Sequence, residues 1–172
     1  MANVNNPHGF RPLMRSVTGG VSSIMNAHKL AGDGTALYIG DAVTLAANAT
    51  KDTQCITASA ATDLLAGVNL IYGALSTATD HAIIPGDGEQ VFEVQIDTAA
   101  VANISYNAAL VATAGDTGTK LSKHSANGVA TTNTLNLRLV GKYRSPDNAW
   151  GAYARVEVIF NKNQRANQLA GV

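Results

Sequence analysis

Residues 135–161 constrain the fold most, because they form two amphipathic stretches on either side of one turn. In the first stretch, alternate positions carry the apolar side chains Leu135, Leu137 and Leu139. In the second stretch, alternate positions carry Trp150, Ala152, Ala154, Val156, Val158 and Phe160. Residues 145–148 (Ser-Pro-Asp-Asn) supply a proline with a fixed φ and side chains that can bond to nearby backbone groups. The spacing predicts a long β-hairpin with one buried face.

The rest of the chain repeats this pattern in shorter pieces, with a strand-like segment about every ten residues. These segments are residues 37–39, 43–45, 55–57, 64–75, 81–84 and 91–96. Strong turn signals separate them, such as Pro-Gly-Asp-Gly at 85–88, and residues 97–111 allow at most one short helix. We therefore predict an all-β fold, an antiparallel β-sandwich or barrel of jelly-roll-like type.

Charge is scarce in this chain and is balanced. Charged residues make up 14% of the 172 residues, and twelve basic residues match twelve acidic ones, so the formal net charge is zero. No global field attracts nucleic acid or an anionic membrane, and neither is an expected partner. The most apolar window, residues 64–75, is shorter than the ~20 residues that a membrane-spanning helix needs. The single Cys55 is expected to be buried and fits a reducing cytoplasm.

The first thirty residues differ in character from those that follow. Asparagine, proline and glycine interrupt every periodic pattern there, yet the apolar side chains Phe10, Leu13 and Met14 provide anchors. We predict an extended N-terminal arm over 1–30, a β-domain over 31–161 and a C-terminal tail over 162–172. The apolar anchors favour packing of the arm on a neighbouring subunit, and packing along its own domain is the alternative.

Motifs that carry chemistry are incomplete. Residues 115–120 (Gly-Asp-Thr-Gly-Thr-Lys) lack the glycine directly before the lysine of a phosphate loop, and Leu121 stands where a magnesium-binding hydroxyl belongs. The four histidines lie far apart and lack the spacing of a zinc site. Glu93 has other carboxylates nearby in sequence, but its parity in an amphipathic strand places it on a solvated face. We predict no catalytic residue, no metal ligand and no cofactor.

Several segments together carry a resemblance to a known class of proteins. They are NPHGFRP (6–12), GDGTALYIGDAV (32–43), VFEVQID (91–97), LRLVG (137–141) and DNAWGAYARVEVIFN (147–161). In this order they resemble small capsid-associated proteins of tailed bacteriophages, of the cement or decoration type. The resemblance implies a non-enzymatic protein that is assembled in the bacterial cytoplasm and resides in the virion. It also implies binding to the major capsid protein on the outside of an icosahedral shell, bridging of neighbouring subunits, and a homodimer or homotrimer.

Under this interpretation the arm makes the binding contacts. The predicted contact residues are Pro7, Phe10, Arg11, Pro12, Leu13 and Met14. The alternatives are a carbohydrate-binding β-sandwich module of a phage particle and another minor virion structural protein. A sugar site usually presents exposed aromatic side chains, and this chain has one tryptophan. A hydrolase would need a convergent carboxylate or histidine site, which no local motif supplies.

Overall fold

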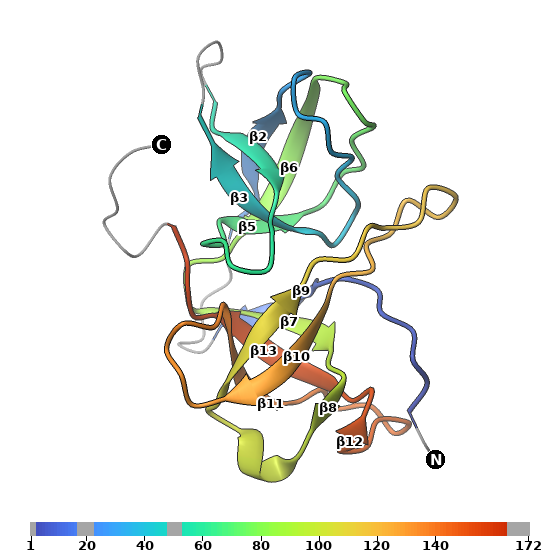
Figure 1. Ribbon diagram of the computed structural model, residues 1–172, viewed down its shortest axis with the longest axis vertical. Coiled ribbons are helices and arrows are strands. Elements are labelled where there is room, and N and C mark those ends of the chain that lie inside the picture. The colour runs from blue at the N-terminus through green and yellow to red at the C-terminus, as the bar shows by residue number, and fades with distance from the viewer. Residues whose placement is uncertain (1–2, 17–22, 48–52, 165–172) are drawn as a thin grey trace.

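The structure, a computed structural model, describes residues 3–16, 23–47 and 53–164, which form two β-lobes stacked along the long axis (Figure 1). The barrel lobe is a closed barrel with strand order β2-β4-β3-β5-β6. Its strands are β2 (Met25–Lys29), β3 (Ala42–Ala46), β4 (Cys55–Ala58), β5 (Gly67–Asn69) and β6 (Thr79–Pro85). All of its pairings are antiparallel except that of β2 with β4.

The sheet lobe is a six-stranded sheet with the order β1-β7-β13-β11-β9-β10. Its strands are β1 (Arg11–Ser16), β7 (Gln90–Gln95), β9 (Asn107–Val111), β10 (Ser125–Ala130), β11 (Leu137–Lys142) and β13 (Arg155–Phe160). The small pair β8 (Thr98–Ala99) and β12 (Gly151–Ala152) and the 3-10 helix η1 (Val101–Asn103) lie at its far end (Figure 1). Ile96 forms a parallel bridge with Ala126, so the edge at β10 curls back to the end of β7.

The predicted fold class is confirmed. The chain is all-β, its sheets are mainly antiparallel, and η1 is the single helical element among the described residues. Residues 31–161 supply strands to both lobes, the closed barrel and the six-stranded sheet. Short strands with similar composition on both sides of residue 86 give no sequence signal for this division.

The predicted hairpin is also confirmed. Strand β11 pairs antiparallel with β13, with Leu137 opposite Phe160 and Leu139 opposite Val158. The buried apolar side chains of the two strands are Leu137, Leu139, Val156, Val158 and Phe160. Ala152 departs from the predicted stripe, because it lies in β12 and is exposed.

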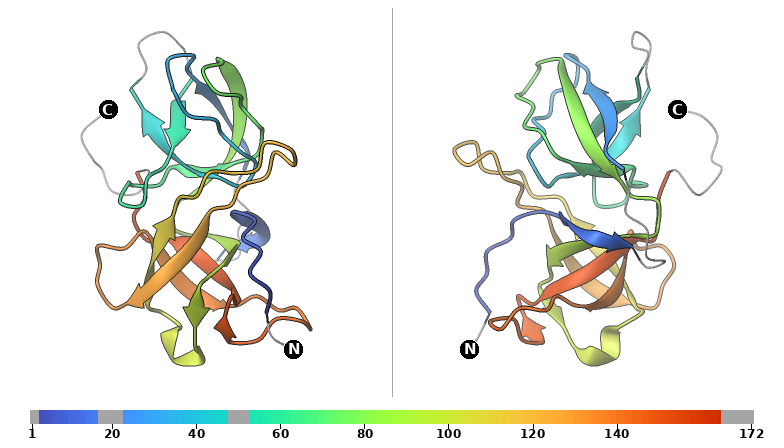
Figure 2. Two further views of the ribbon diagram at one scale, coloured as in Figure 1. Left: turned by 45° about the vertical axis from the view of Figure 1, so that its right-hand side comes forward. Right: turned by 180° about the vertical axis from the view of Figure 1, so that it is seen from behind.

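The N-terminal region differs from the predicted arm. Strand β1 pairs with β7, and β2 is part of the barrel, so much of 1–30 belongs to the fold of its own chain (Figure 2). Pro12 and an irregular register between Pro12 and Ser16 explain why the sequence of β1 lacks a strand pattern. At the other end, Asn163 bridges to Leu65 in the barrel lobe, and residues 165–172 lie outside the described residues.

The arm enters the fold at the junction of the two lobes. The Gly9 N–H donates to the carbonyl of His124 (3.1 Å), and the Phe10 N–H donates to the carbonyl of Gly40 (2.8 Å). Gly9 has a φ of +75°, and a Cβ atom at this position would lie 2.4 Å from the Cβ of Ser122. A glycine is therefore required where the arm, the barrel lobe and the loop between β9 and β10 meet.

Phe10 fills the core of the sheet lobe from this junction. Its ring is 5.6 Å from that of Phe160 and 6.4 Å from that of Phe92, edge-on to both. Phe92 and Phe160 stack with their centroids 4.8 Å apart. Phe10 is only 1% exposed, so the arm supplies a core side chain to the strands that it covers.

The barrel interior contains polar groups that form hydrogen bonds with one another and with the backbone. Lys29 is fully buried, and its Nζ donates to two backbone carbonyls 3.2 and 3.4 Å away. Asn69 donates through Nδ2 to two further carbonyls, which leaves its Oδ1 to accept from Nδ1 of His81 at 2.7 Å. We infer that His81 is the neutral tautomer with its proton on Nδ1, because the buried Nε2 has no hydrogen-bond partner.

We expect Phe10→Ala to lower the free energy of unfolding by about 3–5 kcal/mol, because it leaves a cavity beside two aromatic rings. Val4→Ala is the matched control, since Val4 is on the same arm and is 76% exposed. Urea denaturation of both variants measures the difference. An equal, small loss in the two variants would show that the arm contributes nothing to the core.

The stability should also depend on pH through His81. Burial, reinforced by Lys29 and His28, lowers the pKa of His81 below its usual 6.5. The unfolded chain therefore takes up the proton first, so stability is full above about pH 6.5 and is lost below it, by up to ~1.4 kcal/mol per pH unit. His81→Gln can still donate to Asn69 but does not titrate. Urea denaturation between pH 7.5 and 5.5 should give a shallower slope for this variant, and an unchanged slope would contradict the assignment.

Candidate functional site

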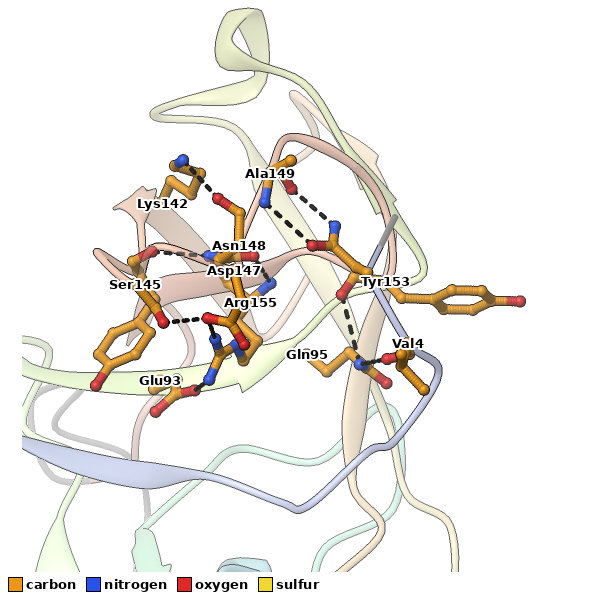
Figure 3. A network of polar contacts seen from close by, with 12 residues as sticks. Val4, Glu93, Gln95, Lys142, Ser145, Asp147, Asn148, Ala149, Tyr153 and Arg155 are labelled. Atoms are coloured by element: carbon orange, nitrogen blue, oxygen red, sulfur yellow. Dashed lines mark hydrogen bonds and ion pairs between the residues drawn. The ribbon is translucent and has the colours of Figure 1, made fainter. Parts of the chain in front are cut away.

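The residues before β1 lie against the tip of the β11–β13 hairpin and are held there by side-chain amides (Figure 3). Asn3 donates through Nδ2 to the carbonyls of Ala149 (2.8 Å) and Ala152 (2.9 Å). The Ala149 N–H donates to Oδ1 of Asn3 at 3.1 Å. One asparagine side chain therefore attaches the start of the described chain to the hairpin.

Gln95 of β7 makes the next attachment. Its Nε2 donates to the Val4 carbonyl (2.8 Å), and its Oε1 accepts from the Asn6 N–H (3.1 Å). Gln95 is almost completely buried, so these bonds replace the water that a solvated sheet face would offer. The arm therefore covers the outer face of β7.

A charged cluster lies beneath this cover. Glu93 is 3% exposed, and its Oε1 lies 3.6 Å from Nε2 of His8 and 3.7 Å from Nη1 of Arg155. Arg155 also donates from Nη2 to Asp147 at 2.6 Å. The prediction that Glu93 lies on a solvated face is wrong, because residues that the sequence assigns to a free arm close over it. Its buried carboxylate faces the imidazole of His8 and the guanidinium of Arg155 and not a second carboxylate, which does not support a glycosidase site.

The hairpin turn is internally fixed. Asn148 is buried, donates through Nδ2 to the carbonyls of Tyr143 and Arg155 (both 2.7 Å) and accepts the Arg155 N–H at Oδ1 (2.9 Å). Hydrogen bonds from the Ser145 hydroxyl and a backbone N–H, together with Arg155, hold the pKa of Asp147 below its usual value. The turn thus offers a rigid surface to which the arm binds.

The predicted contact residues differ in their accessibility. Phe10 is unavailable to a partner because it lies in the core of its own chain. Arg11 is exposed, and Pro12 and Leu13 are partly exposed along β1. Pro7 is partly buried, and the side chain of Met14 lies outside the part of the chain that the structure describes.

Leu13 lines a surface groove of about 820 Å³ on the sheet lobe. Its apolar lining also includes Val101, Ile104, Val140 and Trp150. Its polar lining includes Lys142, Tyr143, Arg144 and Glu157. This groove brings one predicted contact residue together with apolar residues that sequence reasoning missed.

Val101 and Ile104 were missed because their spacing suggests the inner face of a helix. In the structure Val101 begins the 3-10 helix η1, none of whose residues is buried, and it is 64% exposed. Ile104 is 39% exposed. Exposed apolar side chains grouped around one groove are typical of an interaction surface. One sequence signal could have revealed them. The apolar segment is too short to form a helix with one buried face.

The described residues contain no group of three or more His, Cys, Asp or Glu side chains that could hold a metal ion. Within the same residues, no helix has the length and apolar character to cross a membrane. Neither a protein-family model nor a curated protein sequence matches this chain. The groove around Leu13 is therefore the candidate site, on geometry alone.

We expect Asn3→Ala to release the start of the arm, because the side chain makes three hydrogen bonds to the hairpin tip. The Ala149 amide, which donates to Asn3, should then exchange its hydrogen faster, by about tenfold if the bond contributes ~1.4 kcal/mol. Hydrogen exchange followed by NMR measures this directly. Asn5→Ala removes an exposed amide from the same segment and should leave the exchange unchanged. Equal protection in both variants would show that Asn3 does not anchor the arm.

Proposed function

We propose that this protein is a structural component of a tailed-phage virion, where it binds the outer surface of the icosahedral capsid and bridges neighbouring capsid subunits. The proposal rests on the resemblance of five segments to capsid-associated proteins and on one structural observation. This observation is the apolar groove lined by Leu13, Val101, Ile104 and Trp150. Apolar surface of this kind is buried when a partner binds.

The distribution of apolar side chains supports a bridging role. The barrel lobe exposes the side chains of Leu75 (60% exposed) and Ile71 (41% exposed) in the segment between β5 and β6. This segment is far in sequence from the residues that line the groove. A protein that contacts two capsid subunits at once needs a surface on each side, and the two lobes supply them. Two weak contacts made by one rigid body give a much higher overall affinity than either alone.

The arm has a different role in this proposal from the one that its sequence suggests. Because Phe10 and the hydrogen bonds of Asn3 and Gln95 attach it to its own chain, it shapes the docking surface and does not reach across to a neighbour. A surface that is already formed loses little conformational entropy on binding. This favours a protein that adds to a completed shell as a folded unit.

The double variant Val101→Asp and Ile104→Asp should reduce occupancy on capsid shells by about tenfold or more, since burying unpaired carboxylates costs at least ~1.4 kcal/mol. Shells that lack the protein are incubated with purified variants, and the bound fraction is measured after sedimentation. Both residues are exposed, so the fold should not suffer.

Thr132→Asp adds a charge at an exposed loop position of the same lobe and serves as the control. It should bind like the unmodified protein. Leu75→Asp tests the second surface and should lower the stability that the protein gives to shells more than it lowers the bound fraction. Full occupancy and full shell stabilisation by the groove variant would refute the proposed docking site.

A further inference from the structure

A second cavity, of about 710 Å³, lies where the barrel lobe meets the loop between β9 and β10. Three segments of the barrel lobe, within 34–41, 58–61 and 72–75, form its walls together with loop residues 112–117 and His124. The lining side chains that matter here are Tyr38, Asp41, Ser59, Tyr72, Thr113 and His124. A cavity of this volume, mostly apolar with a few polar groups, is typical of a small-ligand site.

The deepest polar group is the carboxylate of Asp41, which is 2% exposed. Its Oδ2 accepts the Tyr38 N–H at 2.8 Å, and its Oδ1 lies 3.4 Å from Nε2 of His124. Nδ1 of His124 accepts the Ala42 N–H at 3.2 Å, so both ring nitrogens are engaged within the protein. His124 therefore has no nitrogen left to activate a nucleophile such as the Ser59 hydroxyl, and the constellation is a binding feature and not a catalytic triad.

The remaining lining is rich in hydroxyl groups and small side chains. Ser59 is 3% exposed, and its Oγ has no hydrogen-bond partner within the protein. A ligand hydroxyl could supply the hydrogen bond that this buried atom lacks. Thr35, Thr113 and Thr117 add hydroxyl groups at the rim. Alanines at 36, 58, 60, 61, 112 and 114 keep the space open.

Two aromatic rings complete the wall. Tyr38 and Tyr72 lie with their centroids 5.5 Å apart and their planes tilted by 53°. Lys120 makes a cation–π contact with this wall, with its Nζ 4.4 Å from the Tyr72 centroid, and it does not line the cavity. Among the described residues, no lysine or arginine lines the cavity, and a phosphate or carboxylate ligand would lack a counter-charge from them.

We propose that this cavity binds a neutral sugar ring. A pyranose presents an apolar C–H face that packs on an aromatic wall and a rim of hydroxyl groups that exchange hydrogen bonds with protein hydroxyls and a carboxylate. The Tyr38–Tyr72 wall, the Ser59 hydroxyl and the Asp41 carboxylate supply these partners. The site shares no lining residue with the groove on the sheet lobe, although Leu75 of the second proposed capsid surface is among its lining residues.

The test is an NMR titration of the full chain with D-glucose, D-galactose, D-mannose and N-acetyl-D-glucosamine, each used separately. At least one sugar should cause saturable shifts confined to the amides of 34–41, 58–61 and 112–117. Tyr72→Ala should weaken that binding by about tenfold, since the wall loses one ring. Tyr106→Ala removes a tyrosine that does not line the cavity and should leave the affinity unchanged.

Ala114→Phe provides a second variant, because residue 114 is exposed and a larger side chain there fills the space without touching the core. It should abolish the shifts even if Tyr72→Ala proves unstable. No saturable shift with any of the four sugars would overturn the proposal. Saturation by phenol and by none of the sugars would also overturn it, because the site would then select an apolar aromatic ligand.

Discussion

The edge-on packing of Phe10 against the stacked rings of Phe92 and Phe160 is the interaction on which the rest of the structure depends. The three rings come from the arm, β7 and β13, and they are each buried to 1% exposure or less. The backbone beside Phe10 is bonded to the barrel lobe at Gly40 and to the β9–β10 loop at His124. A single residue therefore joins the core of one lobe to the junction with the other, and this position dictates the path of the chain on both sides of it.

The course of the arm explains how polar side chains of β7 come to be buried. Glu93 and Gln95 point to the outer face of β7, and they would be solvated if the sheet ended there. The arm closes over them and supplies His8 and backbone groups as partners. Burying polar groups is tolerated only when partners are present, so the arm and this face of β7 require each other. The same closure leaves the groove beside Leu13 as exposed apolar surface on the sheet lobe.

Local patterns in the sequence predict the parts of the fold that local patterns determine. The β11–β13 hairpin follows from alternation and turn chemistry, and it forms as expected. The turn signal at 85–88 marks the end of β6, but the residues that follow it connect the barrel to the six-stranded sheet. Asn127-Gly128 looks like a hairpin turn, but it lies within β10, where Gly128 has a φ of +61° and the register shifts. The dipeptide forms an irregularity within a strand and not a turn, because the choice between the two depends on the neighbouring strand.

Local patterns do not predict contacts between residues that are far apart in the sequence. Nothing near Phe10 in the sequence shows that its partners lie at 92 and 160, and nothing near Glu93 shows that His8 covers it. The candidate groove was anticipated only through Leu13, because the segment with Val101 and Ile104 and the segment with Trp150 lie far from it in the sequence. Residues of a binding surface that assemble from distant segments carry no common spacing, so a single sequence cannot reveal them.

The junction between the lobes connects the fold to the proposed ligand. Asp41 and His124 line the cavity and also belong to the contact that holds the lobes together, through the bond from Ala42 to His124. A ligand that touches both walls can bind only while the lobes are stacked, so by mass action it stabilises that arrangement. The two apolar surfaces proposed for capsid binding lie on different lobes, and their spacing depends on the same junction. A ligand in the cavity would thus favour the one geometry in which both surfaces can bind at once.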